Sequence, residues 1–120
     1  DRGLAILDYA LRRRFAFYPV RPAFESEGFV SYAQELDNDQ FLAVVETVKA
    51  LNRAIEEDET LGSGFTIGHS YLCGLSQRDV SSLRLSRIVD FELLPLLREY
   101  WFDEPDKLEK WERKLRAATK

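Results

Sequence analysis

The strongest constraint on the fold is one long amphipathic pattern in the middle of the chain. Mostly apolar side chains between residues 41 and 55 recur at spacings of three and four, which places them on one face of an α-helix. The members of this stripe are Phe41, Val44, Val45, Val48, Leu51, Asn52 and Ile55. Asp39 precedes the stripe and has a side chain suited to an N-cap. The pattern predicts a long helix, capped by Asp39, with one face buried in a core.

Helical patterns also cover the rest of the chain after Pro22. Residues 26–36 fit a short helix capped by Ser26, and residues 80–102 fit a long one in which Pro95 predicts a kink or a break. A basic final helix follows the "DEP" stretch that ends at Pro105. The inward positions of these last two helices are Leu85, Ile88, Val89, Leu93, Leu96, Leu97, Tyr100, Leu108, Trp111, Leu115 and Ala118, and Trp101 is also expected in the core.

The first 24 residues have a different character. Leu4, Leu7 and Leu11 recur at helical spacing, and the apolar run "FAFY" at residues 15–18 then fits a strand that is buried on both faces. No second convincing strand follows, so the remainder of its sheet would lie outside this chain. We expect this segment to fold back on the bundle or to pair with another copy. The fold class is therefore mainly α: a small helical bundle over residues 25–120, preceded by one helix and one strand left over from an α/β unit over residues 1–24.

Composition narrows the class of protein. A chain of 120 residues with 45% hydrophobic side chains suits one domain, and no apolar run reaches the roughly 20 residues of a membrane helix. One cysteine and one histidine exclude an internal disulfide and argue against a metal site, and we expect a soluble, cytoplasmic protein. The abrupt helical start and the lack of methionine suggest a fragment. Residues 25–60 carry ten acidic and two basic side chains, which argues against broad nucleic-acid binding.

Three consecutive arginines, Arg12, Arg13 and Arg14, end the first predicted helix. Cations at a helix C-terminus stabilise the macrodipole, by roughly 0.3–1 kcal/mol each. Consecutive helical residues project about 100° apart, so at least one guanidinium must point away from its own helix. A fixed planar cation of this kind suits phosphate recognition as well as dipole stabilisation.

The glycine-punctuated loop at residues 61–70 contains the only histidine, His69, between Gly68 and Ser70. This histidine could be an ordinary surface residue or a helix cap, and the "GSGF" stretch lacks the Gly-Lys-Ser/Thr ending of a phosphate loop. We interpret the acidic run Glu56–Glu59 as a solvated helix end and Cys73 as a small buried residue. The basic last helix is either a solvated face or a surface that docks on an acidic neighbour.

Three separated motifs resemble the AAA+ proteins, in the form found in the McrB family. The run "DRGLAILDYALRRRFAFYPV" resembles the segment after the sensor-1 strand, "GFTIGHSYLCGL" (residues 64–75) resembles the Gly-His-Ser-Tyr motif of the lid subdomain, and "LLPLLREYWFDEPDKLEKWERKL" (residues 93–115) resembles the C-terminal helices. The resemblance implies that residues 1–24 are the last helix and strand of the AAA+ α/β core and that residues 25–120 are its helical lid.

The resemblance also implies roles for particular residues. AAA+ subunits form rings that bind nucleotide between neighbours, so Arg13 and Arg14 would be catalytic fingers that reach the neighbouring subunit's γ-phosphate. Arg12 would bind nucleotide, or else face solvent or its own helix dipole. Gly68, His69 and Ser70 would contact nucleotide near the position called sensor 2, where backbone N–H groups at a helix start suit a phosphate.

The function implied is that of a C-terminal fragment of a nucleotide-hydrolysing ring motor. The parent would use GTP or ATP with Mg²⁺, assemble with copies of itself, act on DNA through domains outside this chain, and drive a partner endonuclease. The 120 residues contain no Walker A or Walker B motif, so we expect the chain alone to be inactive and to hold no cofactor or metal. The alternative is a stand-alone helical protein-interaction module whose arginines form a basic docking patch.

Overall fold

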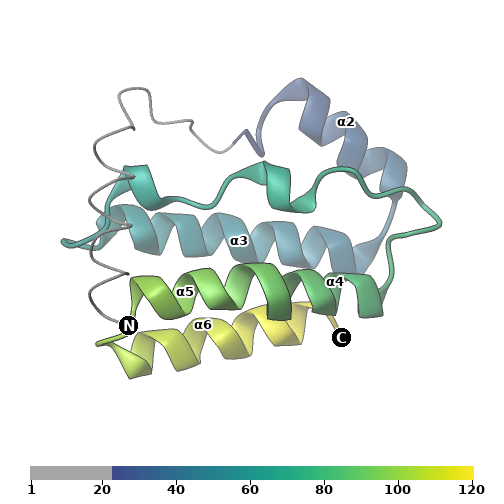
Figure 1. Cartoon of the computed structure of the whole chain (residues 1–120). Helices are drawn as coiled ribbons and strands as arrows, with labels where there is room; N and C mark the ends of the chain where they lie inside the picture. The colour runs from purple at the N-terminus through teal and green to yellow at the C-terminus, as the bar shows by residue number, and fades with distance from the viewer. Residues whose placement is uncertain (1–22) are drawn as a thin grey trace.

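The computed structural model describes residues 23–120, which are helical with connecting loops and contain no strand (Figure 1). The elements are α2 (Glu27–Leu36), α3 (Asp39–Glu57), η1 (Ser63–Phe65), η2 (His69–Leu72), α4 (Ser82–Ile88), η3 (Val89–Leu93), α5 (Leu94–Tyr100) and α6 (Pro105–Ala118). The predicted mainly α fold is confirmed for this part of the chain. The predicted first helix, the strand and the arginine triplet lie outside the described residues.

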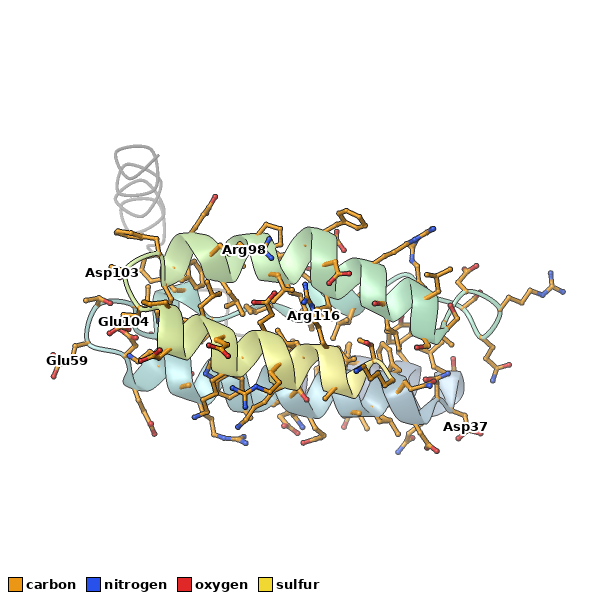
Figure 2. The ribbon with its side chains drawn as sticks, turned by 90° about the horizontal axis from the view of Figure 1, so that it is seen from below. Asp37, Glu59, Arg98, Asp103, Glu104 and Arg116 are labelled. Carbon is orange, nitrogen blue, oxygen red and sulfur yellow. The ribbon has the colours of Figure 1, made fainter. Side chains whose placement is uncertain are left out.

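Three helical rows form the bundle. Helix α3 packs against α6 and α4, and α6 also packs against α5 (Figure 1). Helix α3 and the α4–α5 row run in the same direction, while α6 returns antiparallel to both, so that Glu59, Asp103 and Glu104 lie together at one end (Figure 2). The loop that contains η1 and η2 runs along α3 on the side away from α6 (Figure 1).

The helix starts follow local capping chemistry. The Ser26 hydroxyl accepts a hydrogen bond from the Phe29 amide (3.2 Å), which confirms the predicted cap of α2. The cap of α3 is Asn38, whose Oδ1 accepts from the Phe41 amide (2.9 Å), and the prediction of Asp39 was wrong by one residue. Asn38 has the extended backbone that an N-cap requires, whereas Asp39 is already the first helical residue.

Pro95 breaks the predicted long helix through a widened turn. Residues 89–93 form a π-helical turn, in which the Leu94 amide donates to the Val89 carbonyl five residues earlier. Pro95 has no N–H to donate, and its ring would crowd the carbonyl of Phe91 in a regular α-helix. The wider turn removes that conflict and shifts the register, so that Leu96 and Leu97 still face the core.

The core contains every residue of the predicted α3 stripe, and every inward position predicted for the α4–α5 row. Trp101 and Trp111 are also buried, as predicted, with 1% and 6% of their surfaces exposed. Cys73 is exposed, so the prediction of a buried thiol was wrong. It lies in the loop after η2, where no helical period fixes which side chains turn inward. No helix among residues 23–120 combines the length and the apolar character needed to cross a membrane.

Candidate functional site

The glycine–histidine–serine motif lies in the loop between α3 and α4, and this loop is anchored to the core by side chains distant in sequence. The chain reverses after α3 at Gly62, whose φ of +83° lies in the left-handed region and whose amide donates to the Ile55 carbonyl (3.1 Å). The buried rings and side chains of Phe65 and Ile67 then secure the loop to the core.

Asn52 fixes the residue that precedes the motif. Its side-chain amide donates to the Ile67 carbonyl (2.9 Å), and its Oδ1 accepts from the Ile67 amide (2.6 Å). Asn52 is 6% exposed, so both backbone groups of Ile67 are satisfied inside the core. Asparagine at a buried position of an otherwise apolar stripe was the sequence signal for such a contact, but its partner could not be read from the pattern.

Tyr32 of α2 fixes the other end of the motif. Its hydroxyl donates to the Leu72 carbonyl and accepts from the Leu75 amide, both at 2.9 Å. Burial raises the pKa of the Tyr32 phenol, the Leu75 amide opposes this rise, and Cys73 adds to it. Tyr32 could not be identified from the sequence, because a single tyrosine in a short helix gives no sign of a partner about 40 residues away.

His69 lies between these two anchors and faces the start of the described chain. Its Nδ1 accepts a hydrogen bond from the Ala23 amide (3.3 Å), and its half-buried ring meets the edges of Phe24 and Phe29 at centroid distances of 6.3 and 5.9 Å. The Cys73 thiol donates to the His69 carbonyl (3.4 Å). The Ser70 side chain is exposed.

The structure therefore brings three of the predicted site residues together, Gly68, His69 and Ser70, in one firmly held segment. The other three, Arg12, Arg13 and Arg14, lie outside the described residues. Their roles remain predictions. Within residues 23–120, no group of three His, Cys, Asp or Glu side chains is close enough together to hold a metal ion.

A second polar cluster joins the end of α3 to the start of α6, and the interpretation of residues 56–59 as a wholly solvated run was wrong for Asp58. The Asp58 side chain is 5% exposed. One oxygen accepts from the amide and hydroxyl of Thr60 (2.9 and 2.7 Å), and the other accepts from Trp101 Nε1 and Lys107 Nζ (both 3.0 Å). Burial alone would raise the pKa of the Asp58 carboxyl, but these donors outweigh it and hold the pKa well below its usual range.

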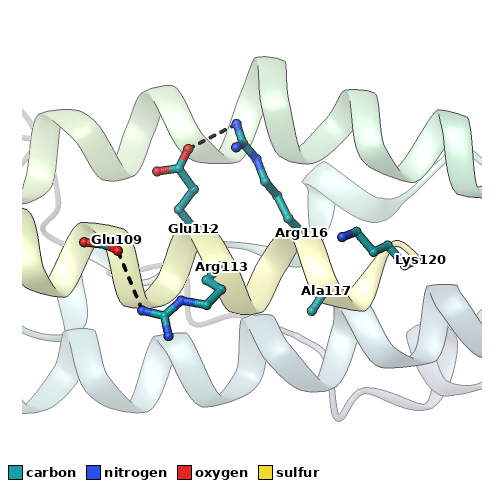
Figure 3. Close-up of a pocket in the computed structure, with 6 residues that line it drawn as sticks. All are labelled: Glu109, Glu112, Arg113, Arg116, Ala117 and Lys120. Atoms are coloured by element: carbon teal, nitrogen blue, oxygen red, sulfur yellow. Dashed lines mark ion pairs between the residues drawn. The ribbon is translucent and has the colours of Figure 1, made fainter.

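The basic side chains of α6 are largely paired within the bundle. Arg116 contacts Glu112 (3.1 Å) and Asp90 (3.5 Å), and Arg113 contacts Glu109 (3.9 Å), along an open groove of about 440 Å³ (Figure 3). Lys110 and Lys114 lie over the Trp111 ring, at 5.4 and 4.7 Å from its centroid. A groove whose arginines already have carboxylate partners is a poor anion site, so we do not place the functional site there.

The described residues thus form an all-helical domain that holds a glycine–histidine–serine segment at fixed points on its surface. Residues 43–109 match the family model described as the alpha-helical lid domain of McrB. The chain is 40% identical, over 120 residues, to the type IV methyl-directed restriction enzyme EcoKMcrB subunit of Escherichia coli (strain K12), with 96% of this chain and 26% of that protein covered. The chain belongs to the McrB family, which confirms the resemblance seen in the sequence. It spans about a quarter of the length of this curated relative.

Proposed function

We propose that this chain forms the helical lid, with the preceding end of the α/β core, of a nucleotide-hydrolysing AAA+ ring motor. The observation that carries the proposal is membership of the McrB family, which rests on the lid-domain match and on 40% identity along nearly the whole chain. Family membership also favours the lid over the alternative of a stand-alone interaction module with a basic docking patch. The nucleotide would be GTP or ATP with Mg²⁺.

The lid would contact this nucleotide through Gly68, His69 and Ser70. Two features support the assignment. The segment is tied to α3 and α2 through Asn52 and Tyr32, so its position is fixed before any ligand arrives. The donors it offers are an exposed serine hydroxyl and an imidazole N–H, both of which fit a phosphate oxygen as acceptor.

The arginine triplet would act across the subunit boundary. Arg13 and Arg14 would stabilise the charge that develops on the γ-phosphate held by the neighbouring subunit, and Arg12 would bind nucleotide or face its own helix dipole. The E. coli relative is named as a subunit of a methyl-directed restriction enzyme. We extend this to a parent protein that acts on DNA through other domains, in a ring of its own copies, together with a partner endonuclease.

The test is nucleotide hydrolysis by the full-length protein with Arg13→Ala or Arg14→Ala. A finger arginine contributes roughly 10³–10⁵ to the rate in GTPases, so at least one variant should lose most of its turnover while nucleotide affinity stays near the wild-type value. Arg53→Ala is the matched control, because Arg53 is exposed on α3 and should leave both quantities unchanged. Normal turnover by both triplet variants would refute the finger assignment.

A further inference from the structure

The chain enters the lid through a short segment whose position is set by long-range contacts. Ala23 donates its amide hydrogen to His69 Nδ1, and Phe24 is buried against the edges of Phe29 and His69. Glu25 follows, and its carboxylate lies 2.7 Å from the Lys49 ammonium on α3. These residues coincide with the boundary at residue 24 that the sequence predicts between the core segment and the lid.

The hydrogen bond from Ala23 also selects one tautomer of a neutral imidazole. A neutral imidazole has one nitrogen that donates and one that accepts, and here Nδ1 is the acceptor. The proton must therefore be on Nε2. The rings of Phe24 and Phe29 meet the imidazole at interplanar angles of 79° and 81°, and these contacts limit its rotation.

We infer that His69 is a positioning residue for the entry segment, residues 23–25. Its Nδ1 holds this segment by accepting a hydrogen bond from the Ala23 amide, a contact that we call the latch. The latch sets the direction in which the lid leaves the preceding segment. The main contribution of His69 comes from Nδ1 and the backbone, and contact of Nε2 with a phosphate is secondary. The latch itself follows from the described contacts. Its consequence for hydrolysis rests on the proposed function, because a lid set at the wrong angle would misplace Gly68 and Ser70 relative to the nucleotide.

Two substitutions distinguish the role of Nδ1 from the role of Nε2. In His69→Asn, the side-chain oxygen takes the place of Nδ1 and can still accept from Ala23, but nothing replaces Nε2–H. In His69→Gln, the amide reaches the place of Nε2 and the acceptor at Nδ1 is lost. His69→Ala removes both, and Arg53→Ala is the surface control.

The first readout, hydrogen exchange at residues 23–25 of the 120-residue chain, does not depend on activity. Loss of one hydrogen bond of about 0.5–1.5 kcal/mol should speed exchange at Ala23 about 2- to 12-fold in His69→Gln and His69→Ala, while His69→Asn should stay within about 2-fold of the wild type. The opposite order, with His69→Gln protected and His69→Asn fast, would overturn the latch.

The second readout is hydrolysis by the full-length protein. The latch predicts that His69→Gln lowers kcat more than His69→Asn does, with a smaller change in KM in each case. Retained kcat in His69→Gln together with its loss in His69→Asn would show that Nε2 matters instead, and would refute the inference. A wild-type protein that hydrolyses no nucleotide would refute the proposed function alone, because the exchange measurement would still decide on the latch.

Discussion

Asp58 makes the most demanding structural prediction of the bundle. Its buried carboxylate accepts four hydrogen bonds, from the amide and hydroxyl of Thr60, from Trp101 Nε1 and from Lys107 Nζ. We predict that Asp58→Ala lowers the free energy of unfolding by about 2–3 kcal/mol, chiefly because the Trp101 N–H is left without an acceptor inside the core.

The magnitude follows from the surroundings of each donor. Trp101 is 1% exposed, so its unpaired N–H costs about 1–3 kcal/mol. The side chain of Lys107 is 48% exposed and also pairs with Glu104 (2.9 Å), so the loss of its second partner costs about 0–1 kcal/mol. Alanine recovers part of the free energy spent in burying a carboxylate, which keeps the total below the sum of the losses.

The assay is urea unfolding followed by far-ultraviolet circular dichroism. With a slope of about 2 kcal/mol/M, Asp58→Ala should lower the midpoint by about 1–1.5 M, and the neighbouring Glu57→Ala, which alters an exposed residue, should change it little. In a Trp101→Phe background no buried indole N–H is left without an acceptor, and the hydrogen bonds from Thr60 are exposed to water, so Asp58→Ala should cost about 1 kcal/mol or less. An equal cost in both backgrounds would refute the reasoning.

Three further predictions concern the same bundle. The lowered pKa of Asp58 means that its stabilisation is present above about pH 4 and is lost as the pH falls further, so the stability gap between the wild type and Asp58→Asn should narrow from pH 6 to pH 3 in urea titrations. Asn52→Leu leaves both backbone groups of Ile67 unpaired and should lower the free energy of unfolding by about 2–4 kcal/mol. A loss under about 0.5 kcal/mol would contradict the role of Asn52 in holding Ile67. Tyr32→Phe should cost about 1–2 kcal/mol and speed hydrogen exchange at the Leu75 amide, and an unchanged exchange rate would contradict its role.

The helices and their buried faces were predictable because each depends on local order. Once the apolar spacing of three and four selects a helix, the same spacing selects the buried side, and the whole α3 stripe was found in this way. The break at Pro95 was predictable for a similar reason, since the missing N–H is a property of one residue. Its form as a π turn was not, because the choice between a kink and a wider turn depends on keeping Leu96 and Leu97 against the other helices.

The side-chain contacts that join distant parts of the bundle were not predictable, because the partners lie far apart along the chain. Asp58 reaches Trp101 across 43 residues, and in the sequence it is one member of an acidic run whose other members are exposed. Cys73 shows the converse error: an isolated small residue in a loop follows no period, so its exposure depends on how the loop is held. Composition alone could not show that this acid is buried, since most acidic side chains are exposed, or that this thiol is exposed, since most free thiols are buried.

This dependence on distant partners bears on how the motif at Gly68–Ser70 could work. Its anchors come from α3 through Asn52, from α2 through Tyr32, and from the entry segment through the Ala23 amide. A displacement of the entry segment therefore acts on His69 directly, whereas the two ends of the motif stay fixed to α2 and α3. Among residues 23–120, His69 is therefore the residue of the motif whose hydrogen bond links the entry segment to the surface that we propose faces the nucleotide.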